Sequence, residues 1–181
     1  MKSPLIIVES PSKIKTLKKF LDNKYAVEAS IGHIRDLPKS QLGIEIDKEF
    51  AAEYHVSPDS KKTVQKLKTA LKNADELIIA TDPDREGEAI AWHIVDELKP
   101  KIPTKRLVFN EITKTAILDA LNNTRDIDSN LVDAQETRRF LDRLFGFMVS
   151  KTMWTNMKGG VSAGRVQSPA VKILVDREKE R

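Results

Sequence analysis

The stretch "LIIATDPDREGEAIAWH", Leu77 to His93, decides the fold class because an apolar run passes directly into a helical pattern. The run "ELIIATD" is typical of a buried strand, and "GEAIAWHIVDELK" has the apolar spacing of a helix. Three more strand-like runs, "LIIVE", "KYAVEASIG" and "RLVFNEI", are separated by helical stretches. Strands that alternate with helices pair in parallel and are covered on both faces. We therefore expect an α/β domain with a parallel four-stranded sheet flanked by helices.

The pattern changes after "NNTRDIDSN", because from Leu131 onward every periodic stretch is helical. These stretches are "LVDAQETRRFLDRLFGFMVSKTMW" and, after a break at two glycines, "SAGRVQSPAVKILVDREKER". We expect a boundary near Asp128. The first domain then covers residues 1–127, and an all-helical segment covers residues 128–181. The segment from Lys39 to Pro58 is mixed and predicts a loop.

Composition sets broad limits on function. The 181 residues carry 31 Lys and Arg against 27 Asp and Glu, a net charge of +4 that permits a nucleic-acid partner without establishing one. The absence of cysteine excludes a disulfide framework and a Cys-ligated zinc site. No apolar run is long enough to span a bilayer, and the N-terminal one is too short for a signal peptide. We expect a cytoplasmic enzyme or binding protein with no membrane partner.

Carboxylates gather at two strand ends. Asp82, Asp84 and Glu86 follow the third predicted strand at alternate positions, and Glu9 closes the first. The carboxyl edge of an open α/β sheet is where ligands bind, and grouped oxygen donors suit Mg²⁺. The sequence therefore predicts a magnesium site made of these four residues. The alternative is that the acidic residues only cap the following helix and interact with its dipole.

Several motifs together resemble one family. "DPDREGEAIAWH", with "IIVESPSK" upstream and "SAGRVQS" downstream, is similar to the N-terminal part of a bacterial type IA DNA topoisomerase of the topoisomerase I branch. The first two motifs correspond to its Toprim domain. "QETRRFLDRLFGF" and "SAGRVQSPAVKILVDRE" resemble the opening of the DNA-groove domain. The resemblance covers essentially the whole chain in the right order. It implies an isomerase that relaxes negatively supercoiled DNA by transient single-strand breakage through a 5′-phosphotyrosine, followed by strand passage.

The resemblance implies roles for individual residues. Glu9 matches the acidic residue beside the scissile phosphate, which relays a proton to or from the 3′-oxygen. Asp82, Asp84 and Glu86 match the magnesium-binding triad. Lys13 matches the lysine that offsets the phosphate charge, and its alternative is a solvated helix lysine.

Three basic residues of the first domain are expected to contact DNA. His33 and Arg35 lie in "GHIRDLP", where His33 follows a predicted strand and could donate to a phosphate. Arg106 opens the fourth predicted strand near the same edge and is a candidate phosphate contact. A structural role is the alternative for His33.

The helical segment is expected to line a groove for single-stranded DNA. Arg138 and Asp142 lie one helical turn apart, and Arg139 lies beside them. Phe147 and Trp154 would offer ring faces to bases, although aromatic residues at helical spacing are usually part of a core. Many members of the resembled family carry tyrosine where Phe147 stands, so a hydroxyl hydrogen bond is lost here.

A helix N-terminus is expected in "SAGRVQS", where backbone N–H groups could hold a phosphate. The residues concerned are Ser162, Ala163, Gly164, Arg165, Val166 and Gln167. Arg165 would add charge and Gln167 a polar donor. The alternative is an ordinary helix start with Ser162 as its N-cap.

The chain contains only Tyr25 and Tyr54, and neither lies in the context of the family's nucleophile. We therefore expect an N-terminal part of a longer enzyme, inactive alone, with Mg²⁺ as cofactor and a single-stranded segment of underwound DNA as partner. We expect a monomer associated with the nucleoid. Alternatives are a type III topoisomerase, a reverse gyrase, a Toprim primase or nuclease, and a non-catalytic DNA-binding module. A nucleotide-binding Rossmann domain is excluded, because no glycine-rich loop follows the first strand.

Overall fold

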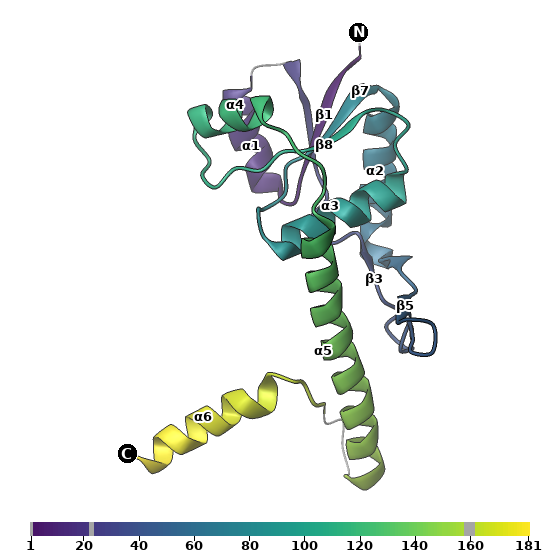
Figure 1. Ribbon diagram of the computed structural model, residues 1–181, viewed down its shortest axis with the longest axis vertical. Coiled ribbons are helices and arrows are strands. Elements are labelled where there is room, and N and C mark those ends of the chain that lie inside the picture. Colours follow the sequence, from purple (N-terminus) through teal and green to yellow (C-terminus); the bar gives the residue numbers. More distant parts are fainter. Residues whose placement is uncertain (1, 22–23, 158–161) are drawn as a thin grey trace. The chain divides into compact units, whose positions relative to one another are not determined.

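A four-stranded parallel sheet organises the first two-thirds of the chain (Figure 1). The computed structural model describes residues 2–21, 24–157 and 162–181. The strand order is β2-β1-β7-β8, and all three pairings are parallel. This confirms the predicted fold class. The strands are β1 (Ser3–Val8), β2 (Ala26–Ala29), β7 (Ala74–Ile79) and β8 (Thr104–Arg106).

Helices cover both faces of the sheet (Figure 1). Alternate residues of a strand point to opposite faces, so Leu5 and Ile7 enter one core while Ile6 and Val8 enter the other. Helices α2 (Lys61–Lys72) and α3 (Arg85–Leu98) pack on the Leu5 face. Helices α1 (Pro11–Phe20) and α4 (Lys114–Asn122) pack on the Ile6 face.

Two predicted segments differ from the structure. The fourth strand ends at Arg106, whereas the sequence pattern extended it to Ile112. Its length is limited because the chain beyond Leu107 leaves the sheet, and Phe109 packs on the core of α1 and α4. The predicted loop 39–58 carries short ladders. These pair β3 (Arg35–Asp36) with β6 (His55–Val56) and β4 (Ile44–Glu45) with β5 (Ala51–Ala52), and η2 (Pro58–Ser60) follows.

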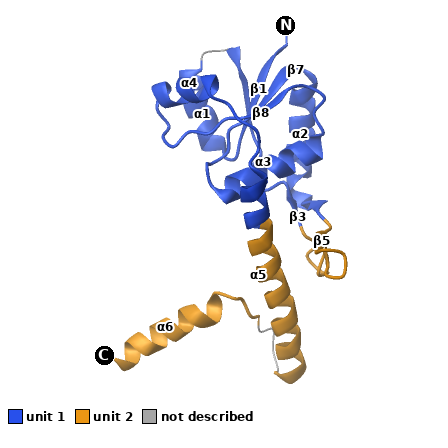
Figure 2. Ribbon diagram, in the orientation of Figure 1, with its two compact units in different colours: residues 1–36, 54–135 blue, residues 37–53, 136–181 orange. Residues whose placement is uncertain are grey.

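The chain divides into two compact units (Figure 2). The first contains residues 1–36 and 54–135, and the second contains residues 37–53 and 136–181. The helical segment consists of α5 (Ser129–Asn156) and α6 (Gln167–Lys179), as the sequence predicted. The division falls within α5, and it adds the β4–β5 segment to the second unit, which the sequence pattern did not indicate. The domain boundary near Asp128 stays a prediction. In the part of the chain that the structure describes, no helix is both long and apolar enough to cross a membrane.

Candidate active site

Two carboxylates meet at the carboxyl edge of the sheet because β1 and β7 are neighbours. The Ala80 N–H donates to the Ile7 carbonyl at 2.8 Å, which keeps the two strand ends in step. Glu9 follows β1 and Asp82 follows β7. The ammonium of Lys13 lies between them, forming an ion pair with Glu9 and another with Asp82 at 2.7 Å. The predicted meeting of Glu9 with the acidic stretch is therefore present for Asp82, with a lysine as the bridge.

Burial distinguishes the members of this group. The side chains of Glu9 and Lys13 are each 14% exposed, whereas that of Asp82 is 54% exposed. Burial alone would lower the pKa of Lys13, but hydrogen bonds and charge from Asp82 and Glu9 raise the pKa above its ordinary value. Lys13 is therefore firmly charged. The Oε2 atom of Glu9 is buried and has no hydrogen-bond partner among the described residues, so it is available to a cation.

Asp84 performs the capping role that was the alternative for the acidic cluster. It is the N-cap of α3, and its carboxylate accepts the Gly87 N–H at 2.7 Å. The turn is tight, because a Cβ on Gly87 would lie 2.1 Å from the Asp82 carbonyl oxygen. Only glycine therefore allows the first turn of α3 to approach the Asp82 backbone this closely.

Glu86 faces two further elements of the first unit. Its Oε2 atom accepts from the Gln135 amide at 3.2 Å and lies 3.6 Å from Nε2 of His33. His33 is carried there by the bend after β2, where Ile31 and Gly32 have φ angles of 59° and 76°. Gln135 is 7% exposed, and no sequence signal singled it out. His33 therefore lies beside the acidic group, and its predicted contact with a DNA phosphate stays a prediction.

Glu9 and Asp82 fit a divalent cation best. Both offer oxygen atoms, they already share one positive charge, and Glu9 has a buried unpartnered oxygen. Across residues 2–21, 24–157 and 162–181, three or more Asp, Glu or His side chains do not converge on one point as a ready metal cage. Asp84 and Glu86 are instead engaged in the hydrogen bonds described above. This arrangement suits a divalent cation that uses few protein carboxylates and keeps several waters.

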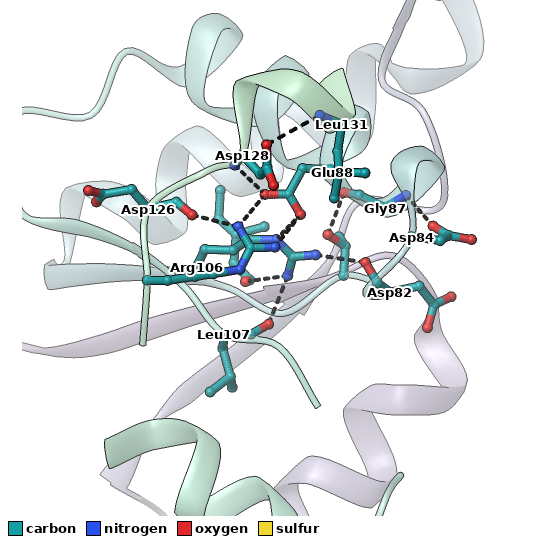
Figure 3. A network of polar contacts seen from close by, with 12 residues as sticks. Asp82, Asp84, Gly87, Glu88, Arg106, Leu107, Asp126, Asp128 and Leu131 are labelled. Atoms are coloured by element: carbon teal, nitrogen blue, oxygen red, sulfur yellow. Dashed lines mark hydrogen bonds and ion pairs between the residues drawn. The ribbon is translucent and has the colours of Figure 1, made fainter. Parts of the chain in front are cut away.

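A buried ion pair lies behind the carboxylates (Figure 3). Glu88 and Arg106 have fully buried side chains, 3.1 Å apart. The Glu88 carboxylate also accepts from Arg125 at 2.9 Å and from the Asp128 N–H at 2.7 Å. Burial alone would raise the pKa of Glu88, but these hydrogen bonds and the two arginine charges lower the pKa below its ordinary value. Glu88 was not among the predicted site residues, although a glutamate between Gly87 and Ala89 in an otherwise apolar helix face could have indicated a buried partner.

Arg106 and Arg35 do not occupy the exposed positions predicted for phosphate contacts. Arg106 is 1% exposed, and its guanidinium is engaged by Glu88 and by backbone carbonyls. Arg35 is 8% exposed, pairs with Asp96, and hydrogen-bonds Nδ1 of His93. Sequence alone gives the charge of an arginine but not its burial, and here both charges have internal carboxylate partners.

His93 is the centre of an aromatic cluster beneath His33. Its ring packs edge-on against Trp92, Tyr54 and His33, with centroids 4.8, 4.6 and 5.9 Å away. Burial, followed by the positive charge of Arg35, lowers the pKa of His93 to about 3. His93 is therefore a neutral residue of this buried cluster.

In the second unit, one face of α5 lines a groove of about 540 Å³. Its residues recur three or four positions apart, as one side of a helix requires. Arg143 stacks over Phe147, with its guanidinium 4.4 Å from the ring centroid, and Trp154 is 60% exposed. The groove is lined by Arg139, Asp142, Arg143, Gly146, Phe147, Ser150, Lys151 and Trp154. The predicted residues Arg139, Asp142, Phe147 and Trp154 therefore share one surface.

The "SAGRVQS" segment is arranged differently from the prediction. Helix α6 begins at Gln167, with Val166 as N-cap and no side-chain cap, so Ser162 does not start the helix. The Ala163 N–H donates to the Ser150 hydroxyl at 3.0 Å, which ties the segment to α5. Arg165 donates to Asp142 at 2.8 Å. Asp142 also lies 3.9 Å from Arg138, so this carboxylate holds two arginines rather than facing the groove alone.

The chain is similar to known DNA topoisomerases along its length. Residues 4–112 match the Toprim domain family, and residues 126–181 match the family described as DNA topoisomerase. DNA topoisomerase 1 of Synechococcus elongatus is 53% identical over 191 residues, covering 98% of this chain and 22% of the relative. DNA topoisomerase 1 of Streptomyces coelicolor is 53% identical over 190 residues, covering 98% of this chain and 20% of the relative.

A solved structure agrees with this likeness. The full-length topoisomerase I from Thermotoga maritima superposes with a TM-score of 0.87 at 49% identity, covering 97% of this chain and 30% of that chain. The chain thus spans about a fifth of the length of the curated relatives it matches. Because the Toprim match covers more than half of its 181 residues, the chain belongs to the Toprim domain family, followed in sequence by a segment of the DNA topoisomerase family.

Proposed function

We propose that this chain supplies the metal site and one wall of the single-stranded DNA groove of a type IA DNA topoisomerase. The whole enzyme would relax negatively supercoiled DNA by transient breakage of one strand through a 5′-phosphotyrosine and by strand passage. The observation that carries the proposal is the pair of strand-end carboxylates, Glu9 and Asp82, bridged by Lys13. The order of the two matched families favours this function over a Toprim primase or nuclease.

The geometry assigns a task to each residue at the sheet edge. Glu9, with one buried unpartnered oxygen, is placed to move a proton to or from the 3′-oxygen at the break. Lys13 would hold positive charge beside the phosphate, as it now does beside two carboxylates. Toprim domains bind a divalent metal, and here the ion is proposed to be Mg²⁺, held by Asp82 and Glu9 with help from Asp84 and Glu86. A bound Mg²⁺ would supply charge that stabilises the phosphate oxygens.

Calorimetric titration with Mg²⁺ tests the metal site. The wild-type chain should bind weakly, because Mg²⁺ dehydrates reluctantly and a DNA phosphate would normally complete its shell. The double variant Asp82→Asn/Asp84→Asn should lose binding. The variant Asp75→Asn, on β7 but outside the cluster, is the matched control and should bind like wild type. If the double variant bound Mg²⁺ as tightly as wild type, the metal site could not lie at this edge of the sheet.

The groove on α5 is proposed to bind single-stranded DNA. Arg139 would neutralise a phosphate, and Phe147 and Trp154 would stack on bases. For single strands, log K falls with log salt at roughly −0.7 per phosphate neutralised. Arg139→Ala should therefore weaken binding of a fluorescent oligonucleotide and flatten this slope by about that amount. Lys72→Ala, on α2 of the other unit, should leave the slope unchanged, and equal slopes in all three proteins would refute the groove.

Cleavage by these residues alone is not expected. Tyr25 packs against the core of α1 and β2, and Tyr54 packs against Trp92 and His93. Neither ring is placed as an activated nucleophile, so no covalent intermediate should form. Incubation with supercoiled plasmid, labelled single strands and Mg²⁺, followed by denaturing gels, should show no protein–DNA adduct. An adduct mapped to either tyrosine would contradict this assignment.

The setting proposed for the enzyme follows from its substrate. We propose that it acts in the cytoplasm on chromosomal DNA as a monomer. Sedimentation velocity of the chain, with and without a single-stranded oligonucleotide, should report one protein copy per complex. A concentration-dependent dimer would overturn the monomer proposal.

A further inference from the structure

Arg106 reaches the backbone of a proposed metal-binding residue. Its Nη2 group donates to the Asp82 carbonyl at 2.7 Å, and its Nη1 group donates to the carbonyls of Ile79 and Leu107 at 3.0 and 2.8 Å. The same guanidinium therefore hydrogen-bonds to the end of β7, to the residue after β8, and to the loop that carries Asp82 (Figure 3). A planar guanidinium can satisfy several acceptors in fixed directions, which a lysine ammonium cannot do.

Glu88 fixes the orientation of Arg106. It accepts from the Arg106 Nε–H at 3.1 Å, while the two Nη groups donate to the backbone carbonyls. Both side chains are fully buried, so water does not compete for these hydrogen bonds. Glu88 is itself held by Arg125 and by the Asp128 N–H, just before α5. The guanidinium consequently has one available orientation.

The Asp82 loop is also fixed by the first turn of α3. Gly87 brings the first turn of α3 against the Asp82 carbonyl, and Thr81 donates to the Gly87 carbonyl at 2.6 Å. With its carbonyl held from inside, Asp82 directs its carboxylate away from Arg106 (Figure 3), where it meets Lys13. The direction of the Asp82 carboxylate thus depends on the buried Arg106–Glu88 network, which contacts the backbone of Asp82 and not its carboxylate.

We propose that Arg106 and Glu88 are positioning residues that set the metal affinity of the Asp82 site through the Asp82 backbone. This inference rests on the proposed metal site and adds to it the residues that aim the ligand. Neither residue would touch the ion or the DNA. Partners that orient a metal ligand typically change affinity by about 10- to 100-fold when they are removed.

The test compares Mn²⁺ affinity with stability in the 181-residue chain. Arg106→Lys keeps the charge but cannot hold Glu88 and three carbonyls together, so it should weaken Mn²⁺ binding by about tenfold or more in electron paramagnetic resonance titrations. Thermal unfolding without metal is measured in parallel. Leu67→Ala, in the core under α2, should lower the unfolding temperature without changing Mn²⁺ affinity. Lys105→Gln, the exposed neighbour of Arg106 on β8, should change neither quantity.

The outcomes separate this inference from the site itself. Unchanged Mn²⁺ affinity in a folded Arg106→Lys variant, with binding lost in Asp82→Asn, would overturn the positioning role and leave the site intact. No Mn²⁺ binding by wild type would overturn both. If Arg106→Lys does not fold, Glu88→Gln serves in its place and should also weaken Mn²⁺ binding. Failure of both variants to fold would assign the network to stability alone and overturn the inference.

Discussion

Acid should destabilise the first unit through His93. The ordinary pKa of histidine is 6.5, and burial beside Arg35 lowers the pKa of His93 to about 3 in the folded protein. Below pH 6.5 the His93 imidazole is protonated in the unfolded chain but stays neutral in the folded chain until the pH approaches 3. The associated stability is therefore fully present above pH 6.5 and is lost as pH falls towards 3. Each pH unit in that window costs about 1.36 kcal/mol, so lowering pH from 7.5 to 5.0 should cost about 2 kcal/mol.

Urea unfolding followed by tryptophan fluorescence measures this loss, because Trp92 contacts His93 directly. The variant His93→Gln cannot be protonated, and its free energy of unfolding should be nearly independent of pH between 7.5 and 5.0. His55→Gln, at an exposed histidine of β6, is the matched control and should retain the wild-type loss. If His93→Gln lost as much stability as wild type over this interval, burial of a neutral His93 could not be the cause.

Three further perturbations test the local geometry. Gly87→Ala should destabilise the chain by about 2 kcal/mol or more in chemical unfolding, because its Cβ would lie 2.1 Å from a backbone oxygen; wild-type stability would refute the close approach. Lys13→Met should strengthen Mg²⁺ binding in calorimetry, because it removes the ammonium that competes for the carboxylates of Glu9 and Asp82. Weaker binding would show that the lysine assists the ion instead. Arg143→Ala should speed amide hydrogen exchange in the β4–β5 segment, since Arg143 donates to the Pro38, Gln41 and Leu42 carbonyls, and unchanged exchange would contradict that anchoring.

Local sequence pattern was sufficient for the sheet and its ligand edge. The apolar runs of β1 and β7 alternate between two cores, and helical spacing identified the helices that cover them. Because parallel strands end at one edge, the proximity of Glu9 and Asp82 could be predicted without knowing strand order. The bridge by Lys13 is a finding of the structure, and the role beside a phosphate that the family resemblance gave to this residue stays a prediction.

The buried charges could not be predicted in the same way. Arg35 and Arg106 were expected at a DNA surface, yet each has a carboxylate partner far away in sequence, Asp96 and Glu88. Whether an arginine is buried depends on the tertiary packing around it, which a local sequence pattern does not contain. The same limit explains why segment 37–53 was not assigned to the second unit: its anchor, Arg143, lies about a hundred residues away.

The structure also explains how three carboxylates at alternate positions coexist at one sheet edge. Each has a different partner: Asp82 has the Lys13 ammonium, Asp84 has the Gly87 N–H, and Glu86 has Gln135 and His33. Their mutual repulsion is therefore offset within the chain by these partners. An arriving cation must compete with these partners, chiefly with the charged Lys13. Metal binding should consequently be weak in the isolated chain and stronger when a phosphate engages Lys13, so DNA and metal are expected to bind cooperatively.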